Sequence, residues 1–214
     1  RLGVLDAAEC PPTYSTNPKL IQGIIAGGFD ALFQSIEGAE DSHEEGANAV
    51  LETGVNQHDV VLGISASSST PFVLGALEKA NELQSLTGLL ICNELPKLAF
   101  VDHLISIIVG PEIITGSTRM KAGTATKMVL NMITTTAMIK LNKTYGNLMV
   151  DLKASNEKLW DRGKRIISHL TDLDHDEALH LLQSADGEVK TAIVMKKLNV
   201  NREDARGMLD DNLG

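Results

Sequence analysis

The stretch that decides the fold is Asp59-Val60-Val61-Leu62-Gly63-Ile64, followed by Ser65-Ala66-Ser67-Ser68-Ser69-Thr70-Pro71. The first run is apolar and of strand length, and the second is a polar loop. Thr70 is a favoured helix N-cap and Pro71 a favoured first helical residue, which predicts a helix from Pro71 to about Leu83. A second apolar run, Leu86 to Cys92, predicts the next strand. Strand, loop, helix and strand in this order predict a right-handed βαβ unit.

Further apolar segments extend this unit into a parallel sheet covered by helices. Runs at Leu20–Ala26 and Leu104–Val109 predict two more strands. A helix is expected from Thr118 to about Leu141, and because it is apolar nearly all round, we expect it to be buried. The chain is therefore assigned to the α/β class.

Both ends of the chain are predicted to be helical. Arg1 to Glu9 is helix-like, and Pro11 is expected to end that helix because proline disfavours helical geometry in the residue before it. Residues 146–168 predict another helix. From Asp174 onward the composition turns polar, and breaks at Gly187 and near residue 200 divide the segment into three short helices. We interpret this tail as a small helical bundle.

Composition excludes several classes of function. The chain has 214 residues, 43% of them hydrophobic and 3% aromatic, which suits one ordinary domain with or without a small appendage. A net charge of −9 without a basic stripe argues against nucleic acid or a membrane as a partner. No run approaches transmembrane length, the start has no signal-peptide layout, and Cys10 and Cys92 form no CxxC pair. These features predict a cytoplasmic protein.

Two segments have the composition of an anion site. The loop Ser65–Thr70 offers hydroxyl donors where a strand ends and a helix begins, which is where open α/β sheets bind ligands. The segment Gly116–Thr124 lies at another helix start, whose free N–H groups and dipole favour anions. Both segments also have a plain interpretation, a capped turn and a solvated surface. The residues that we expect to hold an anion are Ser65, Ser67, Ser68, Ser69, Thr70, Ser117, Thr118 and Arg119.

Two glutamates are candidates for acid–base chemistry. Glu9 is predicted to lie at a helix C-terminus, where the dipole disfavours negative charge and, with partial burial, would raise its pKa toward that of a general acid. Glu40 lies in an acidic patch with Glu37 and Asp41. An exposed helix-end glutamate and an acidic helix N-terminus are the respective alternatives.

Motifs for metal or nucleophilic chemistry are missing from the sequence. The histidines are scattered, and the spacing of His175 and His180 does not align two ligands on a helix face. The chain has no Walker loop, no GxGxxG and no GxSxG. We therefore expect neither a metal nor another cofactor.

Several segments together closely resemble the N-acetylmuramic acid 6-phosphate etherase family. The match covers nearly all of residues 1–170. It is carried by Arg1-Leu2-Gly3-Val4-Leu5-Asp6, Ala8-Glu9-Cys10-Pro11-Pro12-Thr13, Gln22-Gly23-Ile24-Ile25-Ala26-Gly27-Gly28, Glu37-Gly38-Ala39-Glu40-Asp41, Val109 to Thr124, Tyr145-Gly146-Asn147-Leu148-Met149-Val150-Asp151 and Ala154-Ser155-Asn156-Glu157-Lys158-Leu159.

The resemblance implies an organisation for the chain. Residues 1–145 would form a sugar isomerase (SIS) domain, a three-layer phosphosugar-binding sandwich that usually assembles as a homodimer. Residues 146–170 would be a connecting helix. Residues 171–214 look like a three-helix bundle of the ubiquitin-associated (UBA) type, with a structural role.

The resemblance also implies a reaction in cell-wall sugar recycling. The family cleaves the D-lactyl ether at C3 of N-acetylmuramic acid 6-phosphate and yields N-acetylglucosamine 6-phosphate and D-lactate, without a cofactor. The glutamate matching Glu9 protonates the departing lactate, and the one matching Glu40 is the candidate base at C2. The loop Ser65–Thr70 and the residues Ser117 and Thr118 would hold the substrate.

The sequence departs from the family pattern at several points. The family has a strand and a Gly-Thr-Ser-Gly phosphate loop before the position of Arg1, so we expect the active protein to have further upstream residues. Ser68-Ser69 stands where the family usually has Gly-Arg, and residues 93–98 also differ. Two alternatives therefore stay open: a non-catalytic phosphosugar sensor related to glucokinase regulatory protein, and an inactive truncated remnant. Glu9 favours the enzyme, because the sensor lacks that glutamate.

Overall fold

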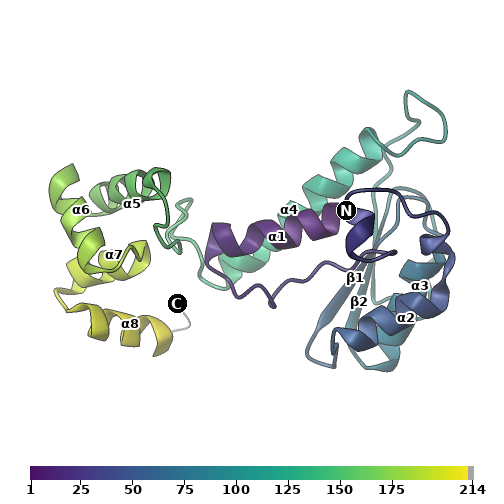
Figure 1. Cartoon of the computed structure of the whole chain (residues 1–214), viewed down its shortest axis with the longest axis horizontal. Helices are drawn as coiled ribbons and strands as arrows, with labels where there is room; N and C mark the ends of the chain where they lie inside the picture. Colours follow the sequence, from purple (N-terminus) through teal and green to yellow (C-terminus); the bar gives the residue numbers. More distant parts are fainter. Residues whose placement is uncertain (212–214) are drawn as a thin grey trace. The chain divides into compact units, whose positions relative to one another are not determined.

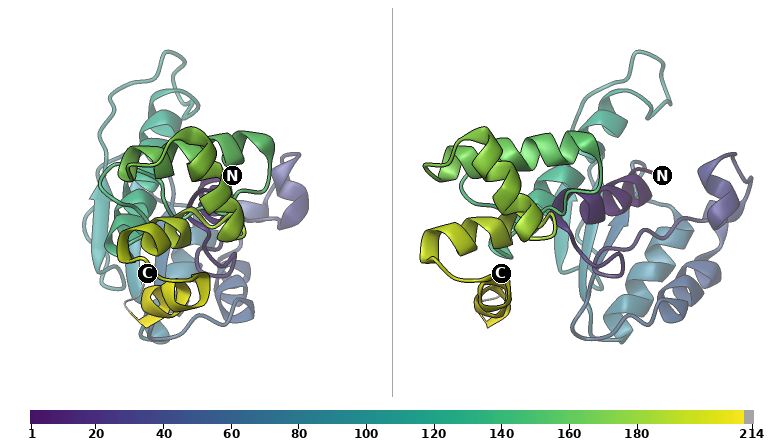
Figure 2. Two further views of the ribbon diagram at one scale, coloured as in Figure 1. Left: turned by 90° about the vertical axis from the view of Figure 1, so that its left-hand side faces the viewer. Right: turned by 60° about the vertical axis from the view of Figure 1, so that its left-hand side comes forward.

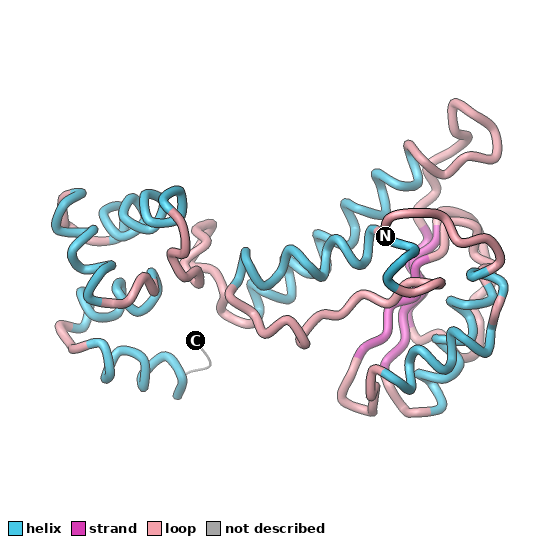
Figure 3. The backbone as a smooth tube through the Cα atoms, in the orientation of Figure 1, coloured by secondary structure: helices cyan, strands magenta, loops and turns pink. Residues whose placement is uncertain are grey.

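The computed structural model describes residues 1–211 and contains a parallel sheet with helices and a separate group of helices (Figure 1). The predicted βαβ unit is confirmed as β1 (Val60–Ile64), α3 (Pro71–Glu82) and β2 (Leu86–Ile91). The third strand is β3 (His103–Ser106). All three strands pair in parallel in the order β1-β2-β3, as the α/β assignment requires. Strands are coloured magenta in Figure 3.

The chain divides into two compact units. The sheet unit comprises residues 1–6 and 22–131, and the helical unit comprises residues 7–21 and those from 132 onward. The division falls inside two helices, α1 (Leu2–Tyr14) and α4 (Lys121–Lys140).

One face of the sheet packs against α3. Leu77 of α3 is fully buried against Leu89, Ile91 and Val101. Burying a leucine or isoleucine side chain contributes about 1.5–3 kcal/mol, so this small cluster is the main source of stability on this face. Gly63 of β1 leaves the space that α3 occupies, since a Cβ atom there would lie 2.7 Å from the side chain of Leu77.

Residues from both ends of the sheet unit lie on the other face. Side chains alternate along a strand, so Ile64 points away from α3. Its Cδ1 atom packs against Gly3 of α1, because a Cβ atom built on Gly3 would lie only 3.0 Å from it. The amide of Asn131 in α4 donates a hydrogen bond to the carboxylate of Asp6 in α1, and Cys92 Sγ lies 3.6 Å from Thr126 Oγ1. The sheet therefore has helices on both faces.

The start of β2 is tied to the start of β3 by a buried threonine. Thr87, which is fully buried, donates its backbone N–H to Asp102 Oδ2 at 2.8 Å, and its Oγ1 lies 2.9 Å from the same oxygen. These hydrogen bonds from Thr87 lower the pKa of Asp102. The bonds hold β2 and β3 in register at the end opposite the carboxyl edge.

Two expectations for the first 26 residues are wrong. Residues 20–26 form no strand, because the segment runs beside α1 instead of a strand: a Cβ at Gly23 would lie 2.6 Å from the Cα of Val4. The first helix does not end at Pro11, since α1 continues to Tyr14 through Pro11 and Pro12. A proline in a helix removes its own N–H bond to the carbonyl four residues earlier, and α1 tolerates that loss twice.

Helix α4 is more exposed than its composition predicts. Met128, Met132 and Ile139 expose about half of their surface, at 52%, 54% and 49%. Only one side of α4 is covered, with Leu130 and Met138 buried, so the expectation of a buried helix is wrong for this chain. No helix within residues 1–211 is both long and apolar enough to cross a membrane.

The helical unit contains the last four helices, coloured green to yellow in Figure 2. The predicted helix at 146–168 begins only at residue 157, where Asn156 Oδ1 accepts a hydrogen bond from Leu159 N and so caps α5. The three short helices predicted after Asp174 are confirmed. The bounds are α5 (Glu157–Leu170), α6 (His175–Ser184), α7 (Val189–Leu198) and α8 (Arg202–Asp211).

The core of the helical unit joins α5 to the helices after it. Ile167 of α5, Leu182 of α6 and Val189 of α7 are fully buried in one cluster. A group of charges fastens the segment before α5 to α7, because Asp151 lies 2.8 Å from Lys143 Nζ and 3.7 Å from Lys190 Nζ. Burial lowers the pKa of Lys190, and Asp151 opposes that shift.

Helices α2 (His43–Glu52) and α3 cross in close contact in the sheet unit. A Cβ atom built on Gly46 would lie 2.0 Å from the carbonyl oxygen of Phe72, and one built on Gly75 would lie 2.0 Å from that of His43. Backbone meets backbone at this crossing, so neither position has room for a side chain.

We expect Gly46→Ala and Gly75→Ala each to lower the free energy of unfolding by about 2–4 kcal/mol, because the added methyl group forces the two helices apart. Urea unfolding followed by circular dichroism measures the change. Gly207→Ala in α8 is the control, since no atom lies within 4 Å of a Cβ there. It should raise helix stability by up to about 1 kcal/mol. Equal stability of Gly46→Ala and the wild type would contradict the close contact.

Candidate functional site

The hydroxyl-rich loop Ser65–Thr70 follows β1 and is held by hydrogen bonds. Ser65 N donates to Leu90 O of β2 at 3.0 Å, and Ser65 Oγ lies 2.8 Å from Thr70 Oγ1. Thr70 is the N-cap residue of α3, but its side chain makes no capping bond because the hydroxyl faces Ser65. Ser65 and Ser68 are buried, whereas Ser67 and Ser69 are exposed. The loop thus exposes the side chains of Ser67 and Ser69, and Ser67 Oγ lies 3.4 Å from the buried Ser65 Oγ.

Ser68 adopts a backbone conformation that suits glycine. Its φ is +73°, in the left-handed region that disfavours a residue with a Cβ atom. This accounts for the glycine that the resembling family usually has at this position. The departure noted in the sequence therefore changes the side chain and leaves the backbone path of the loop in the glycine-type conformation.

The second predicted anion segment precedes α4. The helix begins at Lys121, so Ser117, Thr118 and Arg119 belong to the turn before it. Ser117 is half-buried and its Oγ accepts a hydrogen bond from Arg119 N at 3.2 Å, while the side chains of Thr118 and Arg119 are exposed. Lys121 Nζ donates to Pro111 O at 2.8 Å. Both cations of this segment are exposed, and Lys121 differs from Arg119 in that its ammonium group is bonded to the backbone.

Both anion segments lie at the carboxyl edge of the sheet. One follows β1 and the other follows β3, and Cys92 after β2 contacts Ala122 O at 3.7 Å in the first turn of α4. An open cavity of 490 Å³ at the second segment is lined by Val109, Met120, Lys121, Thr124 and Ala125. No residue of the loop Ser65–Thr70 lines it. This cavity therefore belongs to the second segment alone.

Glu9 lies within α1 and not at its end. The helix continues for another turn to Tyr14, so the premise that the helix C-terminus acts on this carboxylate is wrong. The side chain is exposed. Pro11 and Pro12 have no N–H, so the carbonyls of Ala7 and Ala8 lose their usual helical partners beside Glu9.

Glu40 is held by a short 3-10 helix, η2 (Ala39–Asp41), directly before α2. Gly38 precedes it with a left-handed φ of +76°, and Ser42 follows it as the N-cap of α2, its Oγ accepting from Glu45 N at 3.1 Å. The carboxylate is exposed. Its backbone is thus fixed on both sides, while its side chain is free to meet a ligand.

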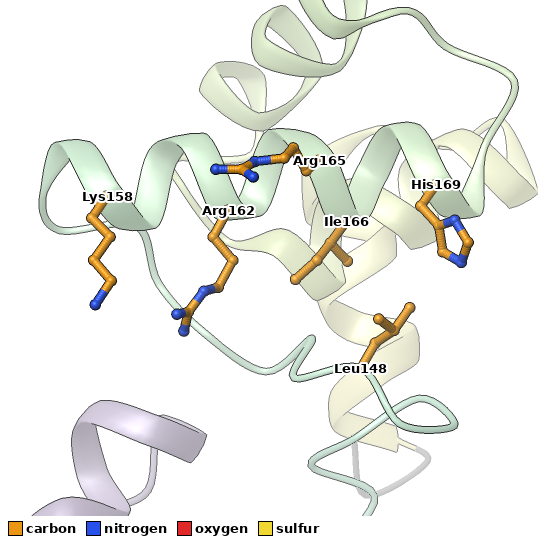
Figure 4. Close-up of a pocket in the computed structure, with 6 residues that line it drawn as sticks. All are labelled: Leu148, Lys158, Arg162, Arg165, Ile166 and His169. Carbon is orange, nitrogen blue, oxygen red and sulfur yellow. The ribbon is translucent and has the colours of Figure 1, made fainter.

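The helical unit contains a cationic cavity that the sequence analysis did not predict. It has a volume of 390 Å³ and is lined by Lys158, Arg162, Arg165 and His169 of α5 together with Leu148 and Ile166 (Figure 4). Arg165 pairs with Asp161, whereas Lys158 and Arg162 make no ion pair within the described residues. The basic residues recur with helical spacing, which is the signal that would have revealed this surface. Its charge suits an anionic group.

No cluster of three or more His, Cys, Asp or Glu side chains that would hold a metal ion is found within residues 1–211. The candidate site residues are two carboxylates, a set of hydroxyls and a guanidinium. Carboxylates transfer protons, and hydroxyls with a guanidinium bind a phosphate.

Comparison with known proteins identifies relatives over the whole chain. Proteins named N-acetylmuramic acid 6-phosphate etherase are 52% identical in Clostridium acetobutylicum, 51% in Rhodopirellula baltica and 49% in Bacillus subtilis. The alignments cover 98%, 99% and 100% of this chain and 70%, 70% and 71% of those proteins. The family model for the glucokinase regulatory protein N-terminal SIS domain matches residues 1–81. The sheet unit accordingly has a SIS-type fold.

We expect Ser68→Gly to raise the free energy of unfolding by about 0.5 kcal/mol, because glycine adopts the left-handed conformation without the Cβ penalty. Ser67→Gly is the matched control: Ser67 has no left-handed φ, and added chain freedom should lower stability by about 0.5–1 kcal/mol. Thermal unfolding of both variants compares them. Equal losses in the two variants would contradict strain at Ser68.

Proposed function

The chain belongs to the N-acetylmuramic acid 6-phosphate etherase family, and we propose how its own residues carry out the reaction of that family. The observation that carries the function is identity of about half over essentially the whole chain to proteins of that name. The chain is accordingly an enzyme, a carbon–oxygen lyase. It cleaves the D-lactyl ether of N-acetylmuramic acid 6-phosphate and yields N-acetylglucosamine 6-phosphate and D-lactate.

The chemistry needs one base and one acid. In the open-chain sugar, the aldehyde at C1 acidifies the proton at C2. A base removes that proton, the C2–C3 double bond forms, and the C3–O bond to lactate breaks while an acid protonates the leaving oxygen. Water then adds at C3 and a proton returns to C2. The substrate's own aldehyde activates the reacting carbon, so side-chain carboxyls suffice for the proton transfers.

We assign the acid to Glu9 and the base to Glu40. Both carboxylates are exposed on backbone that is itself fixed, Glu9 by α1 and Glu40 by Gly38 and Ser42 on either side. Exposure in the free protein leaves each carboxylate accessible to substrate. The two assignments rest on the match of the surrounding segments to the family, because the helix-end argument for Glu9 does not apply.

The phosphate of the substrate is assigned to the two hydroxyl segments. The exposed hydroxyls of Ser67 and Ser69 extend from the base formed by Ser65, Ser68 and Thr70. The other donors are Ser117, Thr118 and Arg119. Arg119 makes no ion pair within the described residues, so its charge is available to the phosphate.

We further propose that the enzyme is a homodimer. Met128, Met132, Ile133 and Ile139 leave an apolar face of α4 in water, and a second copy would cover it. The helices after residue 170 are proposed to form a UBA-like bundle with a structural role. Neither Cys10 nor Cys92 forms a disulfide within the described residues, which fits the proposed cytoplasmic location.

We expect Glu9→Ala to lose D-lactate release while still exchanging the C2 proton with solvent, because the acid is needed only when the C3–O bond breaks. Glu40→Ala should lose both. Lactate release and deuterium uptake from heavy water, measured on the same samples, give the comparison. Loss of exchange in Glu9→Ala, with exchange kept in Glu40→Ala, would reverse the two roles.

We expect the double variant Met128→Glu, Met132→Glu to be monomeric at micromolar concentration, because two charges would be buried without partners in the proposed interface. Light scattering gives the mass in solution. Lys127→Glu, an exposed change of charge on the same helix, is the control and should leave the dimer intact. A monomeric wild type would show that α4 does not form the interface.

A further inference from the structure

Glu112 caps α4 from a distance in the sequence. Its Oε1 atom accepts a hydrogen bond from Ala122 N at 3.0 Å, in the first turn of the helix. A helix N-terminus has unpaired N–H groups and a positive dipole end, so a carboxylate is a favourable partner there. The cap residue here is supplied by the far side of the turn, and not by the residue that precedes the helix.

This bond closes the segment that contains Ser117, Thr118 and Arg119. A second hydrogen bond joins the neighbouring residues: Lys121 Nζ donates to Pro111 O at 2.8 Å. The turn between these ties is largely exposed, with Ile113 and Ile114 exposing 82% and 72% of their surface. Without apolar burial, the turn depends on hydrogen bonds at its base to stay in one conformation.

The other carboxylate oxygen indicates a role beyond stability. Glu112 Oε2 is shielded from solvent and accepts no hydrogen bond within the described residues. Shielding a carboxylate oxygen without a partner is costly, so Glu112 is held at the base of the turn at the expense of stability. Such uncompensated groups occur at functional sites, where positioning matters more than stability.

We propose that Glu112 is a positioning residue for substrate phosphate: by capping α4 it holds the turn 113–120 in the conformation that presents Ser117, Thr118 and Arg119. The inference rests on the proposed function, which assigns those three residues to the phosphate. Glu112 itself touches no substrate. When the tie is lost, the turn samples other conformations, and the apparent affinity falls by the fraction of molecules that remain competent.

The test compares Glu112→Ala with Glu112→Gln in the full chain. Glu112→Ala removes the cap, and we expect KM for N-acetylmuramic acid 6-phosphate to rise about tenfold, with kcat within about twofold of the wild type. A tenfold rise corresponds to a turn that is in the phosphate-binding conformation in about one molecule in ten. Glu112→Gln keeps an oxygen for Ala122 N, so its KM should stay within about threefold. Glu112→Asp is too short to reach and should resemble the alanine variant, which provides a second variant if Glu112→Ala folds poorly.

Binding of inorganic phosphate, measured by calorimetry, provides a readout that does not depend on turnover. Its dissociation constant should rise in Glu112→Ala and Glu112→Asp in parallel with KM, and remain near the wild-type value in Glu112→Gln. An unchanged phosphate affinity in Glu112→Ala, or a fall in kcat alone, would overturn the positioning role. A wild type that binds phosphate but releases no D-lactate would instead overturn the proposed function, and the phosphate comparison would still decide the role of Glu112.

Discussion

The pairing of β2 with a strand on each side is the constraint on which the sheet unit depends. β2 is bonded to β1 and β3, and its residues from Thr87 to Ile91 are almost fully buried. Because both neighbours run parallel to it, the segments after β1, β2 and β3 all emerge at one edge. The loop Ser65–Thr70 and the segment before α4 owe their common position to this ladder, and Thr87 with Asp102 secures its register at the opposite end.

The candidate site combines fixed backbone with free side chains. Hydrogen bonds within the loop after β1 and at the base of the turn before α4 hold the chain, while the groups proposed to meet the substrate stay in solvent. This arrangement suits a reaction whose difficult step is made easier by the substrate's own aldehyde. The protein then has to hold a phosphate and bring two carboxyls to two carbons, and preorganised donors lower the entropy cost of doing so.

The exposed side chains at the start of α4 are polar, whereas several of those further along the helix are apolar. At its start, Glu112 and Lys121 form hydrogen bonds with the backbone, whereas the Arg119 side chain makes no ion pair within residues 1–211. Further along, methionines and isoleucines lie in water on a helix whose covered side already contributes Leu130 and Met138 to the interior. An exposed apolar face of this kind is costly for a lone chain, and this cost is the reason for proposing that a second copy covers it.

The sequence by itself determined the βαβ unit, the α/β class, the tail of short helices and the family, because strand-length apolar runs, helix caps and long motifs are local signals. Three features were decided only by tertiary structure. The run Leu20–Ala26 has strand composition, but it forms no strand, and at Gly23 it lies against α1. Pro11 and Pro12 normally end a helix, yet α1 continues to Tyr14, so no local rule places Glu9 within it. The capping of α4 by Glu112 joins residues across a turn, and such a bond depends on how the chain folds back, which residue spacing alone does not specify.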